Sequence, residues 1–246
     1  MNARSLLVGT FILLAPGCWL SSATAATAPV ADTARPAEIT VAADDNYPPY
    51  IFRNADGKLE GYLVDLWRLW SQQTGVRVRL EATDWARAQH LIADGEADVI
   101  DTIFRTPERE KVFVFSKPYA DLPVPIYVQK SIGGITDLES LRGFFVGVKE
   151  GDACGDYLRR AGVDIQETFA SYSSLVDAAA AGLIKVFCLD EPPANYLLYR
   201  KGADQEFRRA FVLYTGQFHR AVRKGSEATL QRRPQPFVLE SPVLAF

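Results

Sequence analysis

Apolar and polar positions along the chain follow two periods, one typical of helices and one typical of strands. Apolar residues recur at spacings of three and four at Leu63, Leu66, Trp67 and Trp70, which defines the buried face of a helix that ends near Gly75. Residues 76–80 alternate apolar side chains with arginine, which is typical of a strand with one solvated face. The same patterns predict strands at residues 39–43, 97–100, 112–115 and 123–128 and a second helix at residues 85–93.

A second series of strands and helices follows a glycine-containing break at residues 131–134, close to which we place a crossing between two lobes. Strands that alternate with helices favour an α/β layer architecture. The two series resemble each other only in architecture, so we expect two similar lobes with a cleft between them. The predicted strands of the second series cover residues 144–148, 165–168, 186–189 and 211–214, and its helices cover residues 153–161, 175–181 and 192–201.

The division of the chain into lobes follows from these two series. We assign residues 38–129 and 214–246 to lobe 1 and residues 130–213 to lobe 2. Within lobe 1 we expect residues 44–50 to form a loop, because Pro48 and Pro49 cannot sit inside a strand ladder or a helix.

The N-terminal 25 residues are predicted to be a secretory signal peptide. Arg4 precedes a short apolar run, and small residues that include Ala23 and Ala25 provide a cleavage site. The run is too short to cross a bilayer, which takes about 20 residues. A lipoprotein reading would instead use Cys18, although the residues before it fit a lipid-attachment box poorly. Export to the periplasm is therefore expected.

The segments at either end of the folded region carry no periodic pattern. Residues 26–37 are rich in Ala, Pro and Thr and are expected to be a flexible terminus. Near the other end, Pro234 and Pro236 interrupt a helix-like stretch, and an apolar segment follows. We expect the C-terminal end to be truncated or altered.

The net charge limits the classes of binding partner, and the expected compartment bears on whether the cysteines are oxidised. The formal net charge is only −3, with Lys and Arg spread along the chain, which favours neither nucleic-acid binding nor a polybasic membrane surface. After cleavage, Cys154 and Cys188 would lie in an oxidising compartment. They either form a disulfide or remain as two buried thiols, because sequence does not give the Cα separation that decides between these.

Several short motifs, weak singly, form a specific set by their order and spacing. The chain carries YPPY at residues 47–50, DGKLEGYLVDL at 56–66, GEADVI at 95–100, Thr106-x-x-Arg109, FSKPY at 115–119 and LRGFFVGV at 141–148. With this set the chain resembles family 3 periplasmic solute-binding proteins, which include amino-acid receptors of ABC importers and sensor modules of membrane signalling proteins. The resemblance implies an α/β, two-lobed periplasmic-binding-protein fold, with a ligand cleft between lobes joined by two hinge strands.

Arg109 is the leading candidate for ligand binding. The resemblance implies that the arginine of the Thr-x-x-Arg motif pairs with a ligand carboxylate, and a guanidinium offers a planar, permanently charged fork for that purpose. The alternative is a surface salt bridge to Glu108 or Glu110.

Asp190 is the matching candidate in the second lobe, where the family places an acid that receives the ligand ammonium. It directly follows the predicted strand 186–189, and open α/β sheets bind ligands beyond the carboxyl ends of strands. The alternative is an N-cap for the helix that follows. Glu191 could be that cap or a substitute acid.

The remaining candidates would form the walls of the cleft. The resemblance places the ring of Tyr47 against the solute, and Trp85 is either a second wall or part of the core. Thr102 matches a hydroxyl or carbonyl contact. Phe104 stands where several amino-acid binders carry a small hydroxyl residue, which makes the pocket more apolar.

The sequence departs from the family at the start of the helix at residues 153–161. Amino-acid binders often place a threonine after Gly151, where it and the helix amides hold the ligand carboxylate; this chain has Asp152 followed by Ala153. An acid caps a helix well but would repel a carboxylate. Either Asp152 points away, or the ligand is more cationic than a simple α-amino acid.

The expected function is capture of a small polar solute, an amino acid or a related compound, by lobe closure for ABC import or signal sensing. The expected partners are the ligand and either an ABC permease or a membrane receptor module, with a monomeric chain, no nucleic acid and no cofactor. His90 and His219 have no partners at metal-ligand spacing. The alternative is a cyclohexadienyl dehydratase-like enzyme, in which an acid with a raised pKa would act; the candidate acids are Glu150, Asp152, Asp190 and Glu191.

Overall fold

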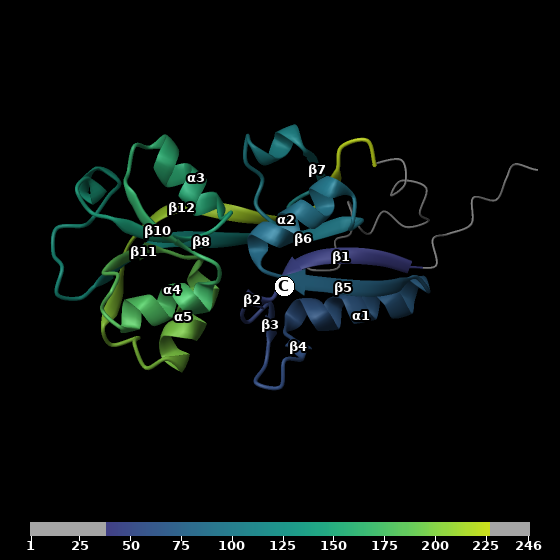
Figure 1. Cartoon of the computed structure of the whole chain (residues 1–246), viewed down its shortest axis with the longest axis horizontal. Helices are drawn as coiled ribbons and strands as arrows, with labels where there is room; N and C mark the ends of the chain where they lie inside the picture. The colour runs from purple at the N-terminus through teal and green to yellow at the C-terminus, as the bar shows by residue number, and fades with distance from the viewer. Residues whose placement is uncertain (1–37, 227–246) are drawn as a thin grey trace, which may run out of the picture. The chain divides into compact units, whose positions relative to one another are not determined.

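The computed structural model describes residues 38–226, except the side chains of residues 166 and 167, and all of them belong to one compact unit (Figure 1). The predicted signal peptide, the predicted flexible terminus at residues 26–37, the Cys18 alternative and the predicted altered C-terminal end lie outside the described residues. None of the described helices is long and apolar enough to cross a membrane.

The first series forms three parallel strands with a helix on either side. β1 (Glu38–Asp44) lies between β5 (Arg77–Thr83) and β6 (Val99–Ile103), and its residues after Glu38 are buried. Burial on both faces follows from the two helices, which Figure 1 shows on opposite sides of these strands. These helices are α1 (Tyr62–Thr74) and α2 (Trp85–Asp94). As predicted, α1 buries Leu63, Trp67 and Trp70, whereas Leu66 is only half-buried.

The second series repeats this arrangement. β9 (Val146–Lys149) pairs in parallel with β10 (Ile165–Phe169) and with β11 (Val186–Cys188). A helix follows each strand, so the carboxyl ends of these strands and the N-termini of the helices lie at one edge of the sheet. The helices are α3 (Ala153–Arg160), α4 (Tyr172–Ala180) and α5 (Glu191–Arg200).

Two long strands connect the series. β8 (Ala120–Gln129) and β12 (Phe207–Arg223) pair antiparallel from Phe207–Gln129 to Phe218–Ala120. Beyond this ladder β12 pairs with β6 and with β7 (Phe113–Phe115), while β8 pairs with β11. These strands therefore run from the sheet of one series into that of the other (Figure 1).

The observed strand pairing concerns two predictions: the extent of the strand at residues 211–214 and the boundaries of the lobes. The predicted strand 211–214 is a small part of β12, whose register shifts twice within the ladder. Residues 126–128 of β8 pair with β11, which belongs to the second series. The lobe boundaries at residues 129 and 213 remain a prediction.

The segment predicted as a loop after β1 contains a short strand. Asn46 and Tyr47 form β2, which pairs with β3 (Ile51–Arg53), and β3 pairs with β4 (Leu59–Glu60). The prediction of an uninterrupted loop is wrong here, because Pro48 and Pro49 lie in the turn between the strands and leave the ladder intact.

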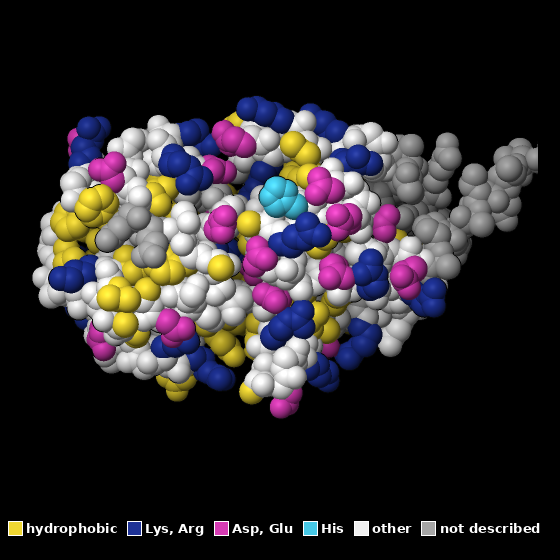
Figure 2. Space-filling model, viewed as in Figure 1, with side chains coloured by type: hydrophobic (Ala, Val, Ile, Leu, Met, Phe, Trp, Pro, Cys, Tyr) yellow, Lys and Arg dark blue, Asp and Glu magenta, His cyan; other side chains and the backbone are white. Residues whose placement is uncertain are grey.

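Charged side chains on the surface are mixed in sign. Figure 2 shows basic and acidic side chains interspersed on the visible face, without a large patch of one sign. This distribution agrees with the small net charge of −3.

Gly61 fixes the turn that carries Tyr47 against the first turn of α1. Its φ is 119°, and a Cβ there would lie 2.3 Å from the carbonyl oxygen of Tyr50. The amide of Leu63 donates to that same oxygen at 2.9 Å. A side chain at residue 61 would therefore push the turn away from the helix.

Replacing Gly61 by alanine should destabilise the fold by about 3 kcal/mol or more, since a left-handed backbone strain and a steric clash add together. Gly57→Ala is the matched control: its φ is 76°, but nothing lies within 4 Å of the added Cβ, so only the strain of about 1 kcal/mol remains. Urea unfolding of both variants measures the difference. Equal losses would contradict the role given to Gly61.

Candidate functional site

One cavity collects most of the predicted site residues and three others. It lies where the carboxyl ends of strands from both series meet, since Asp44 ends β1, Lys149 ends β9 and Asp190 follows β11. Its lining comprises Asp44, Tyr47, Trp85, Thr102, Phe104, Arg109, Lys149, Asp152, Tyr172 and Asp190. Among these, Asp44, Lys149 and Tyr172 are absent from the sequence prediction.

Arg109 crosses from the first series to the second. It opens a short 3-10 helix, Arg109–Lys111, and is 6% exposed. Its Nη2 donates to the carbonyl of Gly151 at 2.9 Å, its Nη1 to the carbonyl of Phe104 at 2.9 Å, and its Nε to Oε1 of Gln89 at 3.0 Å. The guanidinium carbon also lies 5.5 Å from the centre of the Trp85 ring. Burial lowers the pKa of Arg109, and the charge of Asp152 opposes that shift.

The surface salt bridge that was the alternative for Arg109 does not form. Glu108 pairs with Arg160 at 2.8 Å, and Glu110 pairs with Arg105. The neighbouring acids are thus engaged elsewhere, and Arg109 points into the cavity.

Asp190 also faces the cavity. It occupies the N-cap position of α5, but its side chain makes no capping hydrogen bond and instead accepts one from the Tyr47 hydroxyl. Its other oxygen, Oδ1, is buried without a hydrogen-bond partner among the described residues. Burial, with the nearby charge of Asp152, raises the pKa of Asp190 to about 7. Glu191, the other candidate cap or acid, pairs with Arg209 at 2.6 Å.

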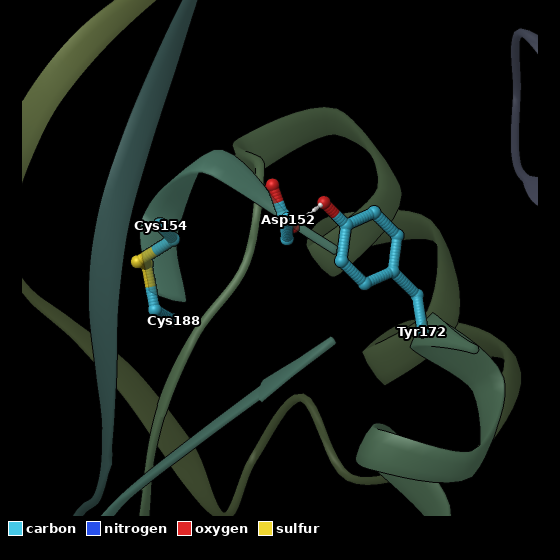
Figure 3. The surroundings of a disulfide bond; sticks show 4 residues. All are labelled: Asp152, Cys154, Tyr172 and Cys188. Atoms are coloured by element: carbon cyan, nitrogen blue, oxygen red, sulfur yellow. Dashed lines mark hydrogen bonds between the residues drawn. A yellow bond between two sulfur atoms is a disulfide. The ribbon is translucent and has the colours of Figure 1, made fainter. Parts of the chain in front are cut away.

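Asp152 does not point away from the site. It is 6% exposed, makes no capping bond to α3, and accepts a hydrogen bond from the hydroxyl of Tyr172 (Figure 3). Burial and the charge of Asp152 raise the pKa of Tyr172 well above its ordinary value, so that hydroxyl remains a donor. Two carboxyl groups of the second series therefore face one cavity.

A disulfide holds these two acids in place. Cys154 and Cys188 are bonded, with their Cα atoms 6.5 Å apart (Figure 3). Cys154 lies two residues after Asp152, and Cys188 lies two residues before Asp190. The bond consequently ties the start of α3 to the end of β11, beside both acid-bearing segments.

Lys149 lines the cavity and holds its ammonium among charged and aromatic side chains. It forms an ion pair with Asp44, and the side chains of the two residues are only 2% and 3% exposed. The ammonium lies 3.8 Å from the centre of the Tyr172 ring, 5.5 Å from that of Tyr47 and 5.7 Å from that of Trp85. Sequence reasoning missed both residues. Their position directly after predicted strands could have placed each of them near the cleft, but it could not have paired them.

The other predicted site residues differ in where they lie and in what they contact. Trp85 is both wall and core, because its indole donates to the Gly151 carbonyl at 3.1 Å while its ring is buried. Thr102 has a φ of 57° and donates its hydroxyl to the carbonyl of Asp101 at 2.7 Å. Phe104 is buried and tilts against Phe218. Ala153 lies outside the cavity lining, in an adjoining hollow that it shares with Phe104.

The lobes touch across the cavity and leave little free space. Contacts of Arg109 with Gly151, Lys149 with Asp44 and Tyr47 with Asp190 all join the two series. The centre of a water molecule has about 20 Å³ in which to move, which is room for about one water. The described arrangement is a closed one.

Comparison with known proteins identifies the family. Residues 39–233 match the bacterial extracellular solute-binding proteins, family 3. The chain belongs to this family. The family and the two-lobed fold predicted from the motifs are thereby confirmed.

Individual members of the family share only limited sequence identity with this chain. The L-cystine-binding protein TcyJ of Escherichia coli (strain K12) is 31% identical over 132 residues, which cover 52% of this chain and 50% of that protein. The chain thus spans about half the length of such curated relatives. A solved histidine kinase sensor domain with similarity to periplasmic binding proteins has a TM-score of 0.74 and 24% identity over 80% of this chain and 87% of its own. An ancestral arginine-binding protein bound to arginine has a TM-score of 0.72 and 25% identity over 81% and 90%.

Removing the disulfide should lower the free energy of unfolding by about 3–4 kcal/mol, because the bond closes a loop whose ends are 34 residues apart. The double variant Cys154→Ser/Cys188→Ser and the oxidised wild type are compared by urea denaturation. Reduced wild type serves as the control and should unfold like the double variant. Oxidised wild type with the same midpoint as the variant would refute the stabilising role.

Proposed function

We propose that this chain binds a small zwitterionic solute, an amino acid or a related compound, between its lobes, and that binding without chemistry is its activity. The observation that carries the proposal is the charge arrangement across one buried cavity. Arg109 approaches it from the first lobe, and Asp152 and Asp190 approach it from the second. Such a site matches a carboxylate on one side and an ammonium on the other.

The carboxylate of the ligand would bind Arg109. Of the three groups that accept from its guanidinium, the Gly151 carbonyl belongs to the opposite lobe and separates from it on opening. A ligand carboxylate would take that place with a stronger, charge-assisted hydrogen bond. The guanidinium keeps its bonds to Gln89 and Phe104 meanwhile, so its orientation is set in advance.

The ammonium of the ligand would bind the two acids. Oδ1 of Asp190 is buried and has no partner in the described part of the chain, so it is ready to accept a hydrogen bond. Asp152 is oriented by Tyr172 and adds a second negative charge. Two buried carboxyl groups side by side repel each other, and a bound cation relieves that repulsion. This accounts for an acid at the position where amino-acid binders of the family often have threonine.

Closure would couple binding to a change of state. Only the closed arrangement brings Arg109 and Asp190 to one ligand, so a ligand that contacts both favours that arrangement by its difference in affinity. The strands β8 and β12 are the connections about which the lobes would move.

The proposal also covers the export of the chain and the proteins to which it delivers its ligand. We infer that the chain is secreted through a cleaved signal peptide, acts in the periplasm as a monomer, and delivers its ligand to an ABC permease or to a membrane receptor module. Membership in a family of extracellular solute-binding proteins supports the first statement. The likeness to a cystine-binding protein supports the transport role, and the fold shared with a histidine kinase sensor domain supports the sensing role.

A second candidate function rests on one observation. Asp190 is buried, and its pKa is raised to about 7, which suits a general acid near neutral pH. The chain could then be a cyclohexadienyl dehydratase-like enzyme. Purified protein is incubated with prephenate or arogenate, and turnover that disappears in Asp190→Asn would replace the binding-only proposal. Two of the other proposed acids are less suitable, because Glu150 is exposed and Glu191 is paired with Arg209.

Arg109→Ala should weaken binding of an amino-acid ligand at least about 100-fold, because a buried charge-assisted contact is lost. Ligands are first found by thermal shift against the common amino acids, polyamines and small organic acids, and Kd is then measured by calorimetry. Arg105→Ala is the matched control, since Arg105 is an exposed arginine of the same segment that pairs with Glu110. Undiminished affinity in Arg109→Ala would show that the site is elsewhere.

Binding should weaken about tenfold between pH 8 and pH 6, because the ammonium needs Asp190 ionised and its pKa is about 7. At pH 6 binding should also release a proton, which calorimetry in buffers of different ionisation enthalpy detects. The stability of the ligand-free protein should change with pH in the opposite direction. Because the pKa of Asp190 is higher in the folded than in the unfolded chain, its contribution to stability falls as pH rises from about 4 to about 7. Equal affinity at pH 6 and pH 8 would contradict the role of Asp190.

A further inference from the structure

The surroundings of Lys149 are those of a bound cation. Its ammonium is enclosed by one carboxylate and three aromatic rings, which is the kind of cage that proteins use to recognise a cationic ligand. The cage is made of Asp44, Tyr47, Trp85 and Tyr172. In this chain the occupant of the cage is a side chain of the protein itself.

The pair spans the two lobes. Lys149 is the last residue of β9 in the second series, and Asp44 is the last residue of β1 in the first. Tyr47 and Trp85 also belong to the first series, whereas Tyr172 begins α4 in the second. The lysine thus reaches across the cleft into a subsite formed mainly by the opposite lobe.

Stability alone does not account for this pair. Burying two charges costs several kcal/mol of desolvation, which their attraction only approximately offsets, so buried ion pairs contribute little net stability. The pair also lines the candidate ligand cavity. Its position therefore points to a role in what the cavity accepts.

We propose that Lys149 is a specificity-determining residue that fills the cationic subsite of the cavity from within. The inference rests on the proposed function of that cavity as an amino-acid site. With the subsite filled, the cavity accepts an amino acid whose side chain is uncharged, and it excludes one whose side chain carries a second cation.

The charges around the subsite support this selection. Lys149 already neutralises Asp44, so a second cation beside it would meet an ammonium with no free carboxylate. The ammonium of the ligand is received separately, by Asp152 and Asp190. Removing the lysine side chain would leave an unpaired acid inside an aromatic cage, which is a site for an arginine, lysine or ornithine side chain.

The test uses Lys149→Ala, with n-propylammonium as a probe because it matches the atoms removed. Propylammonium should raise the Tm of Lys149→Ala more than that of wild type, at matched ionic strength. Lys185→Ala is the control, because Lys185 is an exposed lysine of the same lobe. The double variant Asp44→Asn/Lys149→Ala should lose the response. Lys149→Ser also vacates the subsite and replaces Lys149→Ala in both measurements if the alanine variant fails to fold.

Amino acids form the second arm of the test. Calorimetry should show that Lys149→Ala binds arginine at least about tenfold more tightly than wild type does. Wild type should prefer amino acids with uncharged side chains. The inference is overturned if propylammonium stabilises Lys149→Ala no more than Lys185→Ala, or if wild type binds arginine as tightly as the variant. If propylammonium stabilises Lys149→Ala but no amino acid binds either protein, the proposed amino-acid function fails while Lys149 remains the occupant of the cationic subsite.

Discussion

Antiparallel pairing between β8 and β12 decides where every site residue lies. The two strands carry the chain between the series twice, and they bring the carboxyl ends of both sets of parallel strands to one place. Side chains that follow those strands then face one another across a cleft, although Tyr47 and Asp190, for example, are 143 residues apart in sequence. Which residues line the cavity thus depends more on strand pairing than on local sequence.

The cavity is unusual in how much charge it holds. Asp44, Asp152 and Asp190 face Arg109 and Lys149, so the acids exceed the bases by one when all are ionised. That excess suits a solute that brings a positive charge. Burial first, and the charge of Asp152 second, raise the pKa of Asp190 to about 7. The hydroxyl groups of Tyr47 and Tyr172 donate to two of the three carboxylates and orient them.

Sequence predicted the periodic elements and the residues that belong to motifs. α1 and its buried face followed from spacing, and Arg109 and Asp190 followed from a resemblance that also implied their roles. Lys149 and Asp44 could not be paired in this way, because each reads as an ordinary charge at a strand end and they are 105 residues apart. β2 and β4 are two residues long, too short for any period to be visible. The side-chain direction of Asp152 likewise depends on Tyr172, a contact that only the folded chain provides.

The Cys154–Cys188 bond lies wholly within the second series. It links the segments that carry Asp152 and Asp190 without crossing either connecting strand, so it restrains the acid half of the site and leaves the movement of the lobes free. A ligand that arrives at the open cleft would meet this half already assembled. The entropy lost on binding would then fall on lobe closure rather than on ordering loops, which is how preorganisation raises affinity without any added contact.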